Sequence, residues 1–214
     1  STIIASTFEG LMILDENEKA IYGVAKDMQI SEDQLTYTFT LRDDAKWSDG
    51  EKVTANDFKF SWLRALNPET AAEYAYQLFY IKNGQAYNKG EVTAEEVGIE
   101  VVDESTLKVT LEAPTAYFAE LMAFPTYMPL REDIVTANPE GWANDPETYI
   151  SNGPFKLIEW TMKDRFVVEK NENYWNKDSI KLPGIEFLMV TDQSTAYSSL
   201  QSGEFDMVDT VPAA

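Results

Sequence analysis

Hydrophobic and polar residues alternate most clearly in YTFTLR, residues 37–42, where aromatic and leucine side chains fall on one side and threonines on the other. This period of two predicts a half-buried β-strand. The stretches 98–111 and 153–170 repeat the alternation on both sides of a polar turn, so each predicts a β-hairpin. GIEFLMVTD, residues 184–192, predicts a further, apolar strand.

Helical spacing of apolar residues is found near both ends of the chain. Residues 2–14 carry apolar side chains spaced for one face of a short helix. QSTAYSSLQSG, residues 193–203, predicts a helix that ends at its glycine, and EFDMVD, residues 204–209, predicts a final strand. The resulting β-α-β run over 184–209 predicts two parallel neighbouring strands joined by a helix.

The stretch KWSDGEKVTANDFKFSW, residues 46–62, combines a turn signal, a helix start and several aromatic rings. The Asp-Gly pair at 49–50 is typical of a tight turn. Thr54 and Asp57 have the spacing of a capping box, and the helix that follows should end before Pro68. The rings expected to pack strand against helix, without touching a ligand, are Trp47, Phe58 and Trp62.

Tyrosines crowd the next segment, where Thr70 and Glu73 suggest a second capping box and a helix over about 71–82. On such a helix Tyr74 points away from the other rings, which makes it a candidate for an exposed, grooved face. The alternative is a tyrosine packed at a domain seam. The rings expected to share a face and form core are Tyr76, Phe79 and Tyr80.

Two later features complete the coarse organisation. APTAYFAELMAF predicts a short helix with Tyr117, Leu121 and Phe124 on its apolar face, ending before a proline. From 129 to 150 the chain is rich in Pro, Asn and Gly, which indicates irregular structure and a possible domain crossing. The mixed order of strands and helices predicts an α/β or α+β fold.

Composition excludes several classes of function. The net charge of −20 disfavours binding to nucleic acid or to anionic membranes. The sequence has no Cys and no His, so disulfides, thiolate nucleophiles, histidine triads and the usual zinc sites are excluded. No run of 18 apolar residues is present. The N-terminal STIIASTFEGLMIL has no initiator Met and no basic region, so we expect a fragment of a longer protein rather than a signal peptide.

Candidate catalytic and cofactor motifs give weak signals. Adjacent acids at 43–44, 95–96 and 103–104 are expected to be solvated surface in a chain with 37 acidic residues. No nucleophile-elbow motif and no glycine-rich nucleotide fingerprint is present, so the sequence predicts no cofactor, no metal site and no catalytic residues.

Six segments, however, occur in a specific order and spacing, and they are distributed along nearly the whole chain, from residue 8 to residue 207. They are FEGLMILDENE (8–18), FTLRDDAKWSDGEKVTANDFKFSW (39–62), DESTLKVTLEAPTAYFAELM (103–122), SNGPFKLIEW (151–160), VVEKNENYWN (167–176) and SGEFDM (202–207). Together they resemble the extracytoplasmic solute-binding proteins of peptide ABC importers, in the oligopeptide-binding (OppA-like) group.

The resemblance implies part of a two-lobed clamp of the periplasmic-binding-protein type, with a mixed α+β fold. Residues 1–10 and 132–214 would form a partial first lobe, and 11–131 would form a subdomain inserted into it. The second lobe, which completes the ligand pocket in the family, would be absent from this chain.

The resemblance also implies ligand contacts at a few positions. A family tyrosine that follows the Asn-Pro turn matches Tyr74, and a pocket residue before a proline matches Phe124, where the best-studied member has His. The end of the family's ligand-contacting strand matches Asp209, Thr210 and Val211, without the Tyr-Asn-Asn of some members.

The function implied is capture of oligopeptides outside the cytoplasm, by a periplasmic protein or cell-surface lipoprotein that delivers them to the membrane subunits of an ABC importer. We expect a monomer that catalyses no reaction and uses no cofactor. Capture through the peptide main chain would tolerate many ligand sequences.

Alternatives within and beyond the family remain open. The ligand could instead be a dipeptide, a nickel chelate, an opine or a sugar oligomer, and the protein could serve adhesion or sensing. A different class would be a carboxylate-dependent hydrolase that uses Asp206 and Asp209.

Overall fold

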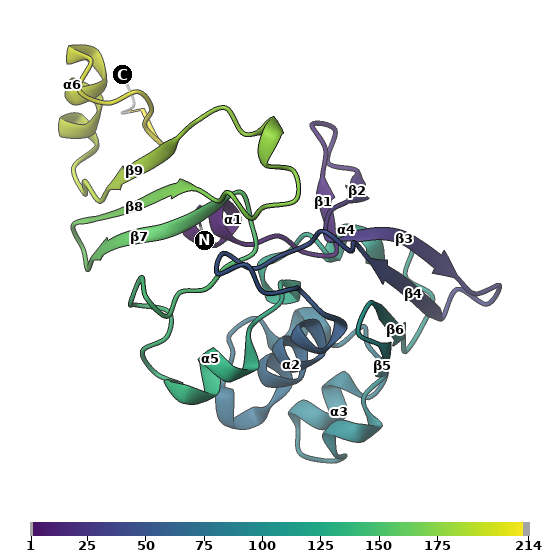
Figure 1. The fold of residues 1–214 in the computed structure, drawn as a ribbon. Coiled ribbons are helices and arrows are strands. Elements are labelled where there is room, and N and C mark those ends of the chain that lie inside the picture. Colours follow the sequence, from purple (N-terminus) through teal and green to yellow (C-terminus); the bar gives the residue numbers. More distant parts are fainter. Residues whose placement is uncertain (1, 212–214) are drawn as a thin grey trace.

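The computed structural model describes residues 2–211 and shows a mixed α/β fold with its sheets at two ends of the molecule (Figure 1). A four-stranded antiparallel sheet with strand order β3-β4-β6-β5 lies at one end, beside a small β1–β2 hairpin. A three-stranded antiparallel sheet, β7-β8-β9, lies at the other. The strands are β1 (Met12–Leu14), β2 (Ala20–Tyr22), β3 (Ala25–Ile30), β4 (Thr36–Leu41), β5 (Ile99–Asp103), β6 (Thr106–Thr110), β7 (Phe155–Thr161), β8 (Arg165–Lys170) and β9 (Gly184–Leu188).

The helices connect and cover these sheets. The longest, α2, lies beside the four-stranded sheet, and α6 extends from the end of the three-stranded sheet (Figure 1). The α-helices are α1 (Thr2–Thr7), α2 (Ala55–Leu66), α3 (Gly84–Asn88), α4 (Phe118–Leu121), α5 (Glu132–Ala137) and α6 (Gln193–Ser202). Short 3₁₀ turns cover Pro68–Thr70, Ala75–Leu78, Ala94–Glu96, Pro125–Tyr127 and Lys177–Ser179.

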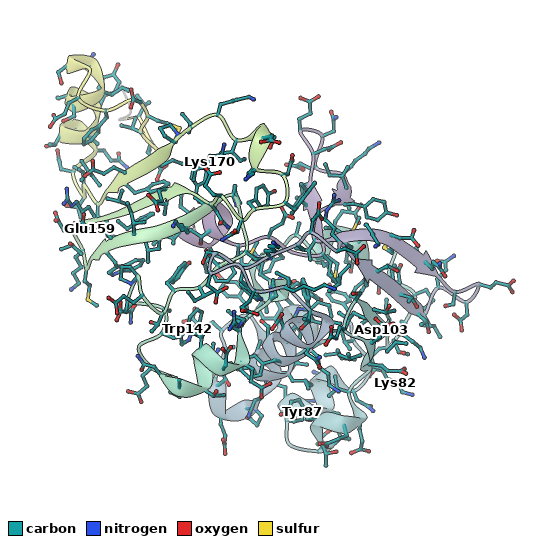
Figure 2. The ribbon with its side chains drawn as sticks, viewed as in Figure 1. Lys82, Tyr87, Asp103, Trp142, Glu159 and Lys170 are labelled. Atoms are coloured by element: carbon teal, nitrogen blue, oxygen red, sulfur yellow. The ribbon has the colours of Figure 1, made fainter. Side chains whose placement is uncertain are left out.

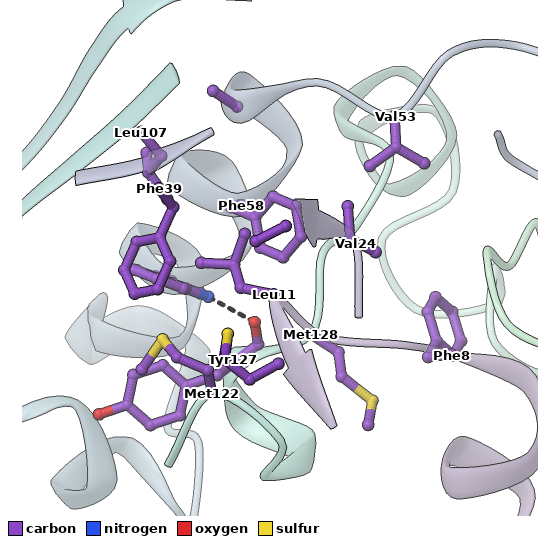
Figure 3. Close-up of a cluster of buried hydrophobic side chains, with 14 of the residues drawn as sticks. Phe8, Leu11, Val24, Phe39, Val53, Phe58, Leu107, Met122, Tyr127 and Met128 are labelled. Atoms are coloured by element: carbon purple, nitrogen blue, oxygen red, sulfur yellow. Dashed lines mark hydrogen bonds between the residues drawn. The ribbon is translucent and has the colours of Figure 1, made fainter. Parts of the chain in front are cut away.

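The main core lies between the four-stranded sheet and α2. The buried side chains of this core include Phe39, Phe58 and Tyr127 (Figure 3). The indole nitrogen of Trp62, in the same core, donates a 2.7 Å hydrogen bond to the backbone oxygen of Tyr127. This bond satisfies the polar atom of a fully buried ring, so the ring can fill the core without an unpaired donor.

Local signals in the sequence predicted several elements correctly. The alternating strand at 37–42 is β4, and the two predicted hairpins are β5–β6 and β7–β8. Gly50 has a φ of +95°, as its turn requires. The N–H of Thr54 donates to the carboxylate of Asp57 at 2.7 Å, which closes the capping box of α2. The rings of Trp47, Phe58 and Trp62 are fully buried.

The predicted helix over 2–14 is wrong beyond residue 7. The helix α1 ends at Thr7, and the chain is extended from there into β1. All residues from 7 to 12 are buried, including Thr7 and Glu9, so burial along this segment has no helical period. Gly10 fits here because a Cβ at this position would lie 2.0 Å from the backbone oxygen of Met122.

The predicted helix over 71–82 does not form. Ala71 adopts a left-handed conformation with a φ of 49°, and a single 3₁₀ turn follows at Ala75–Leu78. Contacts with the rest of the fold decide this conformation, since the backbone oxygen of Gln77 accepts a hydrogen bond from the hydroxyl of Tyr127. Tyr76, predicted to lie in the core, is 52% exposed.

The short helix α4 forms where expected, but its predicted apolar face is wrong. Tyr117 is 52% exposed, and Leu121 and Phe124 are only half-buried. The buried residues are instead Phe118 and Met122. Phe118 packs edge-on against Tyr37 and Tyr127, so the aromatic core selects a different face from the one that periodicity favoured.

The predicted final strand and parallel pair are also wrong. The helix α6 forms and ends at Gly203, but residues 204–211 contain no strand. The N–H groups of Glu204 and Phe205 both donate to the backbone oxygen of Ser199, which holds this segment against the end of α6. Within 2–211, β9 pairs only with β8, and the pairing is antiparallel.

Candidate functional site

Tyr74 and Phe124 come together in an exposed aromatic cluster, although 49 positions lie between them in the sequence. Their ring centroids are 5.8 Å apart, and the ring of Tyr76 lies 6.0 Å from that of Tyr74. Tyr74 and Tyr76 are both about half exposed. We call these three residues, Tyr74, Tyr76 and Phe124, the aromatic cluster.

The cluster is positioned by the buried residue Tyr127. Phe124 precedes Pro125, whose fixed φ begins the 3₁₀ turn that carries Tyr127 inward. The hydroxyl of Tyr127 then donates to the backbone oxygen of Gln77, in the turn that follows Tyr74. A single buried side chain therefore connects the two segments that present the rings.

The same two stretches of the chain, 74–80 and 117–124, also bring together a second aromatic pair. The rings of Tyr80 and Tyr117 are 5.7 Å apart in an edge-to-face arrangement, and their hydroxyl groups are 3.1 Å apart. Large rings with polar tips bind ligands at a low cost in side-chain entropy. The surface around Tyr74 is therefore suited to contact a ligand that offers both apolar groups and hydrogen-bonding groups.

Asp209, Thr210 and Val211 do not join the aromatic cluster. All three are exposed, and they follow α6 at the end of the molecule that carries the three-stranded sheet (Figure 1). The cluster belongs to the segments around α2 and α4, at the other end. The structure thus unites two of the five predicted ligand contacts and leaves the other three apart from them.

A buried carboxyl group that the sequence reasoning missed lies at Glu9, between α1 and β1. Glu9 is 3% exposed and accepts hydrogen bonds from the hydroxyl of Tyr174 and, at 2.6 Å, from the indole nitrogen of Trp175. Burial raises the pKa of the Glu9 carboxyl to about 7. The available signal was an acid set between apolar residues in TFEGLM, together with the two rings of ENYWN.

Within the described part of the chain, the structure has neither a cluster of metal ligands nor a membrane-spanning helix. Among residues 2–211, no three acidic side chains lie close enough together to hold a metal ion. In the same range, no helix has both the length and the apolar character needed to cross a membrane. Asp206, proposed with Asp209 as a hydrolase pair, is exposed.

Comparison with known proteins identifies the class of protein to which this fold and surface belong. The family described as bacterial extracellular solute-binding proteins, family 5 middle, matches residues 19–214, and the chain belongs to this family. Among curated relatives, the oligopeptide-binding protein OppA of Bacillus subtilis is 43% identical over 204 residues, which are 95% of this chain and 37% of the relative. The periplasmic oligopeptide-binding protein OppA of Salmonella typhimurium is 35% identical over 209 residues, or 97% of this chain and 38% of the relative.

Solved structures agree with this assignment. The substrate-binding domain of an oligopeptide ABC transporter from Bacillus anthracis matches with a TM-score of 0.91 and 44% identity, over 94% of this chain and 39% of that one. The OppA of Listeria monocytogenes bound to peptide matches with a TM-score of 0.91 and 42% identity, over 94% of this chain and 40% of that one. The chain therefore spans about two-fifths of the length of the proteins it resembles, and it has the fold of the corresponding part of them.

Proposed function

We propose that this chain supplies part of an extracytoplasmic receptor that binds oligopeptides and delivers them to the membrane subunits of an ABC importer. The observation that carries the proposal is the exposed aromatic cluster, in a chain whose relatives are named for oligopeptide binding. The chain would bind its ligand without catalysis and as a monomer, in the periplasm or as a surface lipoprotein.

We also propose a division of the chain into two parts. Residues 1–10 and 132–214 would form part of one lobe, and residues 11–131 would form the inserted subdomain that presents the aromatic cluster. Tyr74 and Phe124 would contact peptide side chains. The aromatic cluster lies apart from Asp209, Thr210 and Val211. These three residues would therefore contact the ligand only when a second lobe holds the ligand between them and the cluster.

A dipeptide is the second candidate ligand. The dipeptide-binding protein DppE of Bacillus subtilis is 41% identical over 92% of this chain, so the family resemblance extends to binders of shorter peptides. A peptide of two residues offers fewer side chains to the aromatic surface than a longer one does. Comparing ligands of two and of four or five residues would therefore distinguish the candidates.

The proposal is tested by titrating the chain with mixed short peptides, monitored by calorimetry and by NMR of the aromatic rings. We expect affinities weaker than micromolar, since ligand groups that these 214 residues do not contact keep their hydration. At millimolar peptide, the ring signals of Tyr74, Tyr76 and Phe124 should shift. Tyr74→Ser should reduce those shifts, whereas Tyr22→Ser, at another exposed tyrosine, should not.

Two results would contradict the proposal. Micromolar or tighter binding by this chain would show that it does not need a second lobe. Shifts confined to residues outside the aromatic cluster would place the ligand elsewhere.

A further inference from the structure

Glu9 lies where four separate segments of the chain converge. Its backbone N–H donates to the side-chain oxygen of Asn152 at 3.0 Å, and its backbone oxygen accepts from the Asn152 amide at 2.9 Å. Its carboxyl oxygens accept from Tyr174 and Trp175, in the loop after β8. On a further side, a Cβ built at Gly23 would lie 3.2 Å from Glu9 Oε1, so the link between β2 and β3 also packs against the carboxyl.

This convergence connects the two ends of the molecule. Glu9 belongs to the segment that leaves α1 for the β1–β2 hairpin, whereas Tyr174 and Trp175 belong to the loop between β8 and β9. The guanidinium carbon of Arg42, just after β4, lies 3.7 Å from the centre of the Trp175 ring. A change in the Glu9 carboxyl would therefore act on contacts between the loop after β8 and the segments that follow α1 and β4.

The groups around the Glu9 carboxyl shift its pKa in opposite directions. Burial, the largest effect, raises the pKa of Glu9, while the hydrogen bonds from Tyr174 and Trp175 and the positive charge of Arg42 lower it. Arg42 is itself paired with Asp44 at 3.1 Å. Burial and the neighbouring Glu9 raise the pKa of Tyr174, so its hydroxyl stays neutral. The residues of the other two segments that contact Glu9 are Gly23 and Asn152, and neither has a titratable side chain.

We propose that Glu9 makes a proton-dependent contact: its neutral form stabilises the packing of the segment after α1 against the loop that carries Tyr174 and Trp175, and its ionised form weakens this packing. In the neutral form, the carboxyl takes one proton from solvent. It can then donate this proton to the Tyr174 hydroxyl oxygen and still accept from the Trp175 indole. In the ionised form, both rings donate to a carboxylate that has lost its hydration, and burial of that charge opposes closure.

The direction in which pH changes the stability of the fold follows from the pKa of Glu9 in the unfolded chain and in the folded chain. The unfolded chain binds this proton with the ordinary pKa of 4.5, and the folded chain binds it with a pKa of about 7. Because the folded value is higher, the extra stability is fully present below about pH 4.5 and is lost as the pH rises through about 7. Between about pH 5 and pH 8, the folding equilibrium constant should fall about 70-fold through this group alone.

The first test compares the wild-type chain with Glu9→Gln in urea unfolding across this pH range. Gln cannot ionise, and its amide can donate to Tyr174 while its oxygen accepts from Trp175, so it mimics the neutral form. We expect the ratio of the wild-type folding constant to that of Glu9→Gln to fall by about 70-fold between about pH 5 and pH 8. Glu16→Gln, at an exposed acid of the β1–β2 turn, should keep a constant ratio to wild type.

The second test needs no variant of Glu9. The indole N–H signal of Trp175, assigned with Trp175→Phe, should titrate in the wild-type NMR spectrum with a midpoint near pH 7, because its acceptor gains charge there. An indole signal that does not titrate between about pH 5 and pH 8 would overturn the proposal, and so would a constant ratio of wild type to Glu9→Gln. If Glu9→Gln fails to fold, the indole titration alone decides.

Discussion

Asn152 shows how much of this fold depends on single polar side chains. It is 2% exposed and pairs with both the N–H and the C=O of Glu9, a residue that lies 143 positions earlier. An extended segment outside a sheet has no neighbouring strand to satisfy its backbone groups, so a side-chain amide takes that role here. Asn171 acts similarly by donating to the backbone oxygen of Gly153 at 2.9 Å.

Replacement of Asn152 by Ala should destabilise the chain by about 2–4 kcal/mol, because two buried backbone groups of Glu9 lose their partners. Urea unfolding of the two proteins measures the difference. Asn144→Ala, at an exposed asparagine, should change stability by less than about 0.5 kcal/mol. A similar small effect at Asn152 would show that water replaces its hydrogen bonds at no cost.

At the scale of secondary structure, α2 shows how local and distant contacts combine. Its start is local, since Asp57 accepts from Thr54 at 2.7 Å. The same carboxylate also accepts from the indole nitrogen of Trp47 at 3.3 Å, which ties the helix start to the turn at 48–50. The cap could be predicted from the sequence, because it involves residues three positions apart. The hydrogen bond from Trp47 could not, because it depends on how the turn at 48–50 folds back toward the helix.

Asp57→Ala should cost about 1–2 kcal/mol of stability, because the first turn of α2 loses its cap and Trp47 loses an acceptor. The measurement is chemical denaturation followed by circular dichroism. Asp27→Ala, at an exposed acid of β3, is the matched control and should have an effect below about 0.5 kcal/mol. Equal effects of the two substitutions would mean that the capping box contributes nothing to stability.

At the scale of the whole molecule, hydrogen bonds near the turn at 48–50 hold the two ends together. The N–H of Ser48 donates to the backbone oxygen of Ser151 at 2.7 Å, and the amide of Asn173 donates to the oxygen of Ser48 at 3.0 Å. Charged side chains are spread over both ends, with Glu159 and Lys170 at one and Lys82 and Asp103 at the other (Figure 2). The chain has 37 acidic and 17 basic residues, so repulsion between acids acts across the whole surface.

Added salt should therefore stabilise the chain. Raising the ionic strength from about 0.01 M to about 0.15 M shortens the screening length from about 30 Å to about 8 Å. We expect a gain on the order of 1 kcal/mol, or about 3 °C in Tm, by calorimetry at neutral pH. The effect should shrink as the pH approaches the isoelectric point of about 4.2. A fall in Tm with salt at neutral pH would show that attraction between the surface ion pairs outweighs the repulsion.

Features set by near neighbours were predictable from the sequence alone. The alternation of β4, the Asp-Gly turn at 49–50 and the cap of α2 each depend on residues within a few positions, so local sterics and periodicity are sufficient. The order of motifs also identified the family correctly. The proposed domain boundaries and ligand contacts stay predictions, although Tyr74 and Phe124 do meet.

Other features depended on residues far apart in the chain, and only the tertiary structure decided them. The end of α1, the irregular backbone at 71–74 and the buried face of α4 follow from contacts with other segments, which outweigh helical propensity. Glu9 is the clearest case, because its partners Tyr174 and Trp175 lie 165 and 166 positions later in the chain. Its pKa near 7 follows from removal of the carboxyl from water, and desolvation is a property of the assembled fold.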